Sequence, residues 1–167
     1  EWWKHTQSLT ERPVKGMLTG PYTIADWSFN EYYMSREAFI LDLAKAVHEE
    51  AVDLERAGAK YIQIDEPAIS TRPEEMELAS RALGIVTNGL TAYTITHICY
   101  GDFAKVYDYL VGLPVDMLDL ELANSNYDLL DLFRRYPTDK GLSMGVTDVH
   151  THKVESVEEI VEGIKRG

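Results

Sequence analysis

The chain has 167 residues, of which 45% are hydrophobic and 26% are charged, a composition typical of a globular domain with a core of its own. The formal net charge of −12 argues against binding to nucleic acids or anionic membranes, because both are polyanions. No apolar run approaches the roughly 20 residues that a membrane helix needs, and the first residues lack the apolar segment of a signal peptide. Since a single cysteine cannot form an internal disulfide, we expect a reducing, cytoplasmic location.

Strand and helix patterns alternate along the whole chain. Short apolar runs rich in β-branched residues predict five strands, at 15–19, 61–65, 94–100, 115–121 and 141–148. Helical spacing and end signals predict five helices, at 35–58, 73–89, 103–111, 126–136 and from 156 onward. Ser35 and Gly58 are the expected caps of the first helix, and Ser156 with Glu159 forms a capping box before the last one. The segment after Gly20-Pro21 is expected to be a loop.

Repeated strand–helix units with buried strands indicate an α/β fold with a parallel sheet. Such a sheet can be open and doubly wound, or closed as a TIM (β/α)8-type barrel. The Gly-x-Gly-x-x-Gly motif of a dinucleotide-binding sheet is absent from the sequence. Polar residues gather instead at the C-terminal ends of the predicted strands, where barrels keep their active sites. A full barrel needs about 250 residues, so we interpret residues 1–167 as one partial domain, an incomplete barrel of about five βα units.

Ionisable side chains stand at the C-terminal ends of four successive strands. They are Asp65-Glu66, His97-x-Cys99, Glu121 and Asp148-x-His150. His97 and Cys99 are two residues apart in one strand, so their side chains point the same way. With the carboxylate of Glu121 from the neighbouring strand they offer nitrogen, sulfur and oxygen ligands to zinc, and three protein ligands leave a position for substrate. Zinc with a thiolate ligand is suited to bind and deprotonate a substrate thiol.

Each of these groups also has an ordinary structural explanation. His97 can be a packed histidine and Cys99 an inert buried thiol. Asp65-Glu66 can be a helix-capping or loop pair, Glu121 can balance an arginine, and His150 can lie in a solvated loop. Taken together, these explanations require that all four groups fall at the same end of successive strands by coincidence.

Seven segments follow one another in the order and spacing of one known family. They are Gln7-Ser8-Leu9-Thr10, the run from Pro13 to Pro21, Trp27-Ser28-Phe29, the run from Gln63 to Ala68, the run from Thr96 to Tyr100, Glu121, and the run from Gly145 to His150. Through them nearly the whole chain resembles the C-terminal catalytic barrel of cobalamin-independent methionine synthase. The resemblance implies zinc-dependent transfer of a methyl group from methylated folate to the thiol of homocysteine, giving methionine.

The resemblance also implies roles for individual residues. His97, Cys99 and Glu121 match three of the zinc ligands of the family. Asp65 matches the aspartate that holds the amino group of homocysteine, a role that its charge suits.

Two further residues match the family's donor side. Trp27 matches the aromatic on which the pterin of the methyl donor stacks, although a simple loop anchor is its structural alternative. His150 matches the histidine proposed to protonate the departing amine of the folate, which is otherwise a very poor leaving group.

The chain departs from the family at several positions. Cys99 is its only cysteine, so the cysteine that is the family's fourth zinc ligand has no counterpart. Ala123-Asn124-Ser125 replaces the usual Ser-Arg-Ser after Glu121, and Thr151-His152 replaces the common Ser-Pro after His150. The missing arginine would have suited the anionic polyglutamate tail of methyltetrahydrofolate.

Two alternatives therefore stay open beside the methionine synthase interpretation. One is a thiol methyltransferase of the same superfamily that takes its methyl group from a methyl-corrinoid protein. The other is a non-catalytic barrel fragment that binds metal or a partner. Whether another chain or segment completes the barrel stays open as well.

Overall fold

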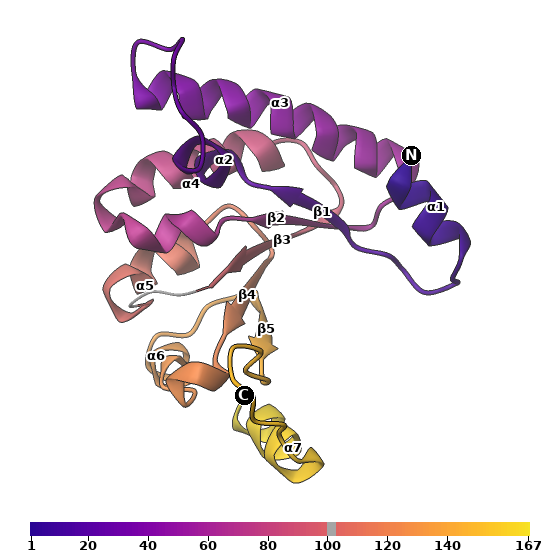
Figure 1. Ribbon diagram of the computed structural model, residues 1–167, viewed down its shortest axis with the longest axis vertical. Coiled ribbons are helices and arrows are strands. Elements are labelled where there is room, and N and C mark those ends of the chain that lie inside the picture. The colour runs from indigo at the N-terminus through magenta and orange to yellow at the C-terminus, as the bar shows by residue number, and fades with distance from the viewer. Residues whose placement is uncertain (100–102) are drawn as a thin grey trace.

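The structure is a computed structural model that describes residues 1–99 and 103–167. Its centre is a parallel sheet whose strands lie in the order in which they occur in the chain, β1-β2-β3-β4-β5. They are β1 (Gly16–Thr19), β2 (Tyr61–Asp65), β3 (Tyr93–Ile98), β4 (Met117–Glu121) and β5 (Gly141–Gly145). The row of strands is curved (Figure 1). The predicted α/β fold with an incomplete TIM-type barrel is thereby confirmed.

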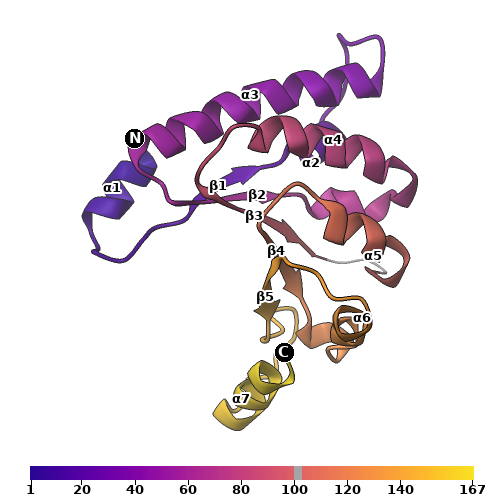
Figure 2. The same ribbon diagram turned by 180° about the vertical axis from the view of Figure 1, so that it is seen from behind.

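The helices that connect the strands lie on the outer side of this curve, as Figures 1 and 2 show from opposite directions. They are α3 (Arg36–Ala57), α4 (Met76–Thr87), α5 (Phe103–Gly112) and α6 (Leu129–Arg135). Helix α1 (Trp2–Ser8) is joined to the segment before β1, because the indole Nε1 of Trp3 donates to the carbonyl of Val14 at 3.0 Å. Helix α7 (Val157–Arg166) follows β5. In the described part of the chain, no helix has the length and apolar character required to cross a bilayer.

The strand residues alternate between two faces with different neighbours. Ile62 and Ile64 of β2 are fully buried in the core beneath the helices, and Leu118 of β4 is buried there too. Gln63 and Asp65 point to the opposite face, in keeping with the period of two along a strand. Among the predicted site residues, that second face carries Asp65, His97 and Glu121.

The predicted helix ends are confirmed for the two helices with the clearest signals. The hydroxyl of Ser35 accepts from the backbone N–H of Ala38 at 3.1 Å, and Gly58 ends α3 in a left-handed conformation at φ 108°. Ser156 and Glu159 form the reciprocal capping box at the start of α7.

Other elements differ from the prediction for local reasons. A short helix, α2 (Pro21–Asp26), occupies part of the predicted loop; six residues are too few to show a helical period. Helix α6 starts at Leu129 and not at Asn126, because Asn126 and Tyr127 have φ values of 52° and 65° that no helix accepts.

Smaller differences concern the ends of elements. The helix predicted from residue 73 opens as a 3-10 turn, η2 (Pro73–Glu75), before α4. Helix α1 lies in a segment for which no element was predicted. Strand β3 ends at Ile98, and the end of the strand predicted to residue 100 falls outside the described residues.

Candidate active site

A pocket of about 350 Å³ opens at the C-terminal ends of β3, β4 and β5. His97, Cys99, Asp119, Glu121 and His150 are among the residues that line it. Four of these five were singled out from the sequence, and the pocket brings them together from the ends of β3 and β4 and from the loop after β5. Asp119 was not, because a single aspartate within an apolar strand has no motif to mark it.

The ring of His97 is fixed by the strand beside it. His97 and Asp119 are register partners in β3 and β4, and Nδ1 of His97 lies 2.8 Å from Oδ2 of Asp119. The other carboxylate oxygen of Asp119 accepts from the hydroxyl of Ser143, its register partner in β5. The hydrogen bond to Asp119 raises the pKa of His97, against the opposing effect of burial. Burial raises the pKa of Asp119, but the bonds from His97 and Ser143 outweigh it, so that pKa lies below its usual range.

Cys99 directly follows β3, and Glu121 is the last residue of the neighbouring strand β4. Burial and then the negative charge of Glu121 raise the pKa of the Cys99 thiol above its ordinary value. Cys99 is therefore a protonated thiol at neutral pH in the metal-free chain. A divalent cation bound between this thiol and this carboxylate would favour the charged form of both groups, because its positive charge stabilises the thiolate and offsets the repulsion between the two anions.

His150 lines the same pocket and remains partly exposed. Its Nδ1 lies 3.7 Å from Oε1 of Glu121 and 3.4 Å from Oδ1 of Asp148, and its backbone N–H donates to the same Asp148 oxygen at 2.9 Å. Glu121, Asp148 and His150 can each bring one ligand atom within 4.8 Å of the others. Within residues 1–99 and 103–167, His97, Cys99 and Glu121 do not form such a close group, although all three line the one pocket.

The donor set fits zinc by its chemistry. Imidazole nitrogen, thiolate sulfur and carboxylate oxygen are the three ligand types that zinc takes in proteins. The bond between Nδ1 of His97 and Asp119 is the support that a metal-binding histidine usually has, and it leaves Nε2 as the nitrogen for a metal.

Asp65 ends β2 next to His97 and is also held by polar neighbours. Its register partner in β3 is His97. The amide of Gln63 donates to Oδ1 of Asp65 at 2.6 Å, and the carbonyl oxygen of Gln63 in turn accepts from the ammonium of Lys15. This chain of bonds orients the Asp65 carboxylate on the same face of the sheet as the pocket.

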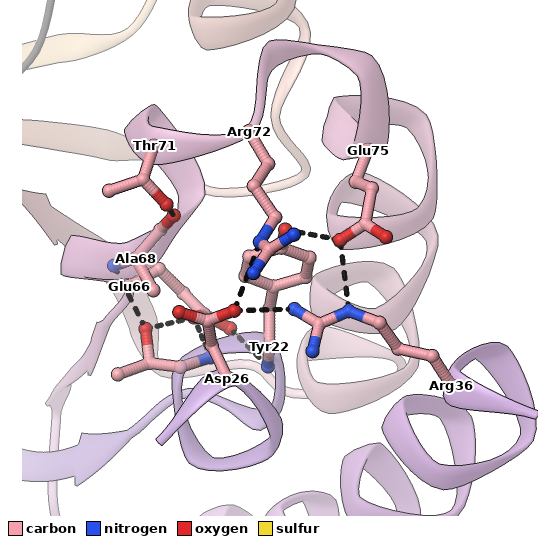
Figure 3. A network of polar contacts seen from close by, with 9 residues as sticks. Tyr22, Asp26, Arg36, Glu66, Ala68, Thr71, Arg72 and Glu75 are labelled. Carbon is pink, nitrogen blue, oxygen red and sulfur yellow. Dashed lines mark hydrogen bonds and ion pairs between the residues drawn. The ribbon is translucent and has the colours of Figure 1, made fainter. Parts of the chain in front are cut away.

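Glu66, the next residue, turns away from the pocket and into the protein. Its carboxylate is fully buried and accepts from the N–H groups of Tyr22 and Thr23 at 3.1 and 2.8 Å and from the Thr23 hydroxyl at 2.7 Å (Figure 3). Those are N–H groups of the first turn of α2, so Glu66 caps this helix. Burial raises the pKa of Glu66 to about 7. The capping explanation considered for Asp65-Glu66 thus holds for the second of the two residues.

A network of ion pairs holds the other end of α2 (Figure 3). Oδ1 of Asp26 lies 2.7 Å from a terminal guanidinium nitrogen of Arg36 and 3.2 Å from Nε of Arg72. Arg36 also pairs with Glu75, which accepts from the Tyr22 hydroxyl at 2.5 Å. Because its members lie far apart in the chain, no local sequence signal predicts this network.

Trp27 directly follows the clamped end of α2. Its backbone N–H donates to the carbonyl of Thr23 at 3.0 Å, and its side chain is 70% exposed. The backbone of Trp27 is therefore fixed at the end of α2, while the residue is largely open to solvent.

Comparison with known proteins places these features in a family. The model of the cobalamin-independent synthase catalytic domain matches residues 1–167. The methionine synthase of Saccharolobus solfataricus is 44% identical over 153 residues, which are 92% of this chain and 46% of that protein. The methionine synthase of Pyrococcus horikoshii is 43% identical over 160 residues, which are 96% of this chain and 47% of that protein. The chain thus spans about half the length of the curated relatives it matches.

Solved structures agree with the sequence relatives. A B12-independent methionine synthase from Shewanella sp. W3-18-1, solved in complex with selenomethionine, superimposes with a TM-score of 0.88 at 31% identity. The match covers 98% of this chain and 53% of that one. A putative vitamin-B12 independent methionine synthase from Listeria monocytogenes shares the fold, with a TM-score of 0.69 at 20% identity over 93% of this chain and 52% of that one. The chain described here belongs to the cobalamin-independent methionine synthase catalytic-domain family.

Proposed function

We propose that this chain supplies the metal-binding and amino-acid-binding part of an enzyme that moves a methyl group from methylated folate to the thiol of homocysteine. The observation that carries the proposal is the shared pocket of His97, Cys99, Glu121 and His150, beside Asp65, in a family of methionine synthases. If these polar side chains had gathered by accident, the hydrogen bond from His97 to Asp119 would have no functional explanation.

In this proposal His97, Cys99 and Glu121 would hold zinc. The ion would lower the pKa of a bound substrate thiol, so that the sulfur is nucleophilic at neutral pH. The raised pKa of Cys99 means that the chain itself releases a proton when the site fills. Nδ1 of His150 lies 3.7 Å from Oε1 of Glu121, so the proposed proton donor would stand next to the position where the sulfur would be held.

Asp65 would bind the ammonium group of homocysteine. Its carboxylate is aimed by Gln63, shares a sheet face with His97 and ends the adjacent strand. A charge-assisted hydrogen bond there orients the amino acid so that its side chain reaches toward the β3 and β4 ends.

Trp27 and His150 would serve the methyl donor. The exposed indole of Trp27 offers a flat face for a pterin ring. His150 would give a proton to the amine that departs when the methyl group leaves, and its Nδ1 lies 3.7 Å from Glu121 and 3.4 Å from Asp148. The exposed tryptophan favours a folate over a methyl-corrinoid donor.

Metal binding by single variants tests the proposal. The chain is loaded with Co²⁺ as a spectroscopic substitute for zinc, and the thiolate-to-metal absorption band is recorded before and after adding L-homocysteine. We expect one thiolate band from Cys99 and a stronger band once homocysteine binds. Cys99→Ser should remove the first band, and His97→Ala should weaken zinc binding at least tenfold.

Asp148→Asn provides the matched control, because Asp148 belongs to the close group of Glu121, Asp148 and His150 and not to the proposed ligand set. We expect this variant to bind zinc as the parent chain does. A site that loses zinc with Asp148→Asn but keeps it with Cys99→Ser would contradict the proposed ligands. A band that homocysteine leaves unchanged would contradict thiol binding at the metal.

A further inference from the structure

Three polar residues lie side by side on neighbouring strands of the sheet, and two of them line the pocket. His97, Asp119 and Ser143 are register partners in β3, β4 and β5. Oδ2 of Asp119 lies 2.8 Å from Nδ1 of His97, and Oδ1 of Asp119 accepts from the Ser143 hydroxyl. Both carboxylate oxygens are thus engaged, one on each side, and the carboxylate plane has little freedom to turn.

This arrangement determines which nitrogen of His97 carries the proton. A carboxylate accepts hydrogen bonds and cannot donate one, so the nitrogen that faces Asp119 must be the N–H of the neutral ring. The lone pair is then on Nε2. An imidazole in water prefers the opposite tautomer, so removing Asp119 would place the hydrogen on the nitrogen that a metal needs.

We propose that Asp119, braced by Ser143, is a positioning residue that holds His97 in the Nδ1–H tautomer with Nε2 presented to the pocket. Asp119 acts through His97, because both of its oxygens are occupied within the sheet. The inference rests on the proposed function, since the Nδ1–H tautomer matters for function only if Nε2 binds a metal. The tautomer itself is a property of the metal-free chain.

The first measurement therefore needs no metal. The chain is labelled with ¹⁵N-histidine and its ring signals are recorded by NMR at a pH above the pKa of His97, with His97→Gln used to assign them. We expect the Nδ1–H tautomer in the parent chain and a shift toward Nε2–H in Asp119→Ala. Asp119→Asn retains an acceptor oxygen and should restore the Nδ1–H form at least in part. An Nε2–H signal for His97 in the parent chain overturns the inference.

The second measurement is zinc affinity by competition with a chelator. Asp119→Ala should bind zinc about 10–100-fold more weakly, the loss typical when the partner of a metal-binding histidine is removed. Ser143→Ala should show a smaller loss in the same direction, and it keeps the inference testable if Asp119→Ala does not fold. Asp131→Asn, an exposed carboxylate paired with Arg134 on α6, is the control and should bind like the parent.

The outcomes separate the inference from the proposed function. If the parent chain binds zinc and Asp119→Ala binds it with the same affinity, the positioning role is overturned and the proposed metal site stands. A parent chain that shows the Nδ1–H tautomer but binds no zinc overturns the proposed metal site and leaves the hydrogen-bonding role of Asp119 standing.

Discussion

The side chains at the pocket are aimed by partners one strand or two residues away. Asp119 fixes the ring of His97, and Gln63 fixes the carboxylate of Asp65. Each partner has a partner of its own, Ser143 for Asp119 and Lys15 for Gln63. A strand alone determines which face a side chain points to, whereas these bonds determine its rotamer, which is what a reaction requires.

The proposed role of Asp65 in binding the ammonium group of homocysteine predicts a selective loss. Asp65→Asn keeps the size of the side chain and removes its charge, so the proposed bond would lose about 1.5–3 kcal/mol, or about 10–150-fold in affinity. Zinc content should not change, because Asp65 is not in the ligand set. Calorimetric titration of the zinc-loaded chain with L-homocysteine measures the first quantity and metal analysis the second.

Asp53→Asn is the matched control for this substitution, since Asp53 lies exposed on α3 in a pair with Arg56. It should leave homocysteine binding unchanged. Equal affinity in Asp65→Asn and the parent chain would exclude the assigned role of Asp65.

At the scale of elements, α2 is held at both ends by side chains that lie far from it in the sequence. Glu66 binds its first turn and the Asp26 network binds its last residue. Gly20 caps the helix where a side chain would overlap the carboxyl group of Glu66. Helix α2 thus contacts the residue after β2 through Glu66 at its first turn, and Trp27 follows its last residue.

Gly20 should therefore tolerate no side chain. In Gly20→Ala the added methyl group displaces Glu66 from its three donors, and we expect the free energy of unfolding to fall by about 1–3 kcal/mol. Gly112→Ala is the control, because nothing lies within 4 Å of the added methyl group at the end of α5. Urea titrations of both variants measure the difference; equal stability would show that Glu66 can rearrange at no cost.

The buried carboxyl of Glu66 predicts that stability depends on pH. Glu66 has a pKa of about 7 when folded, against 4.5 for the free side chain, so the folded chain binds its proton more tightly than the unfolded chain does. The resulting stabilisation is complete below about pH 4.5 and is lost as the pH rises to about 7, a difference of about 3 kcal/mol. Unfolding by urea at a series of pH values measures this loss.

Glu66→Gln cannot titrate and identifies the source of the effect. This variant should lack that part of the pH dependence while it is less stable in absolute terms, since an amide N–H faces backbone donors. The same slope in the parent and in Glu66→Gln would assign the pH dependence to another group.

Local sequence patterns predict some elements of this fold and miss others. The five strands, α3 with its caps and the capping box of α7 follow from local patterns, because period, cap and stop signals lie within a few residues of one another. Helix α2 escapes prediction because it is held by Glu66, more than forty residues later in the chain. Asp119 and Ser143 escape for the same reason, since only the register of three strands places them beside His97.

At the scale of the whole molecule, the apolar core lies on one side of the sheet. Ile64 is fully buried between the sheet and the helices, whereas Met17, on the opposite face, is 61% exposed. Tyr61 and Tyr93 are exposed on that face as well. Stability therefore comes from the layer between sheet and helices, and the face that carries the site contributes little to it.

Two truncations should show this asymmetry. Ile64→Ala removes buried groups and should lower the free energy of unfolding by about 2–5 kcal/mol, while Met17→Ala should change it by less than about 1 kcal/mol. Both free energies come from urea-induced unfolding followed by circular dichroism. A large loss for Met17→Ala would mean that another surface covers this face in solution.

The consecutive order of the strands also has a consequence for how the pocket comes into being. Each strand pairs with the one made just before it, so no strand has to be inserted later between two that are already paired. Closing each pair requires only the loop of a single βα unit, which keeps the entropic cost of every step low. Asp65, His97 and Glu121 can therefore come together in the order of synthesis, as the growing chain adds one unit at a time.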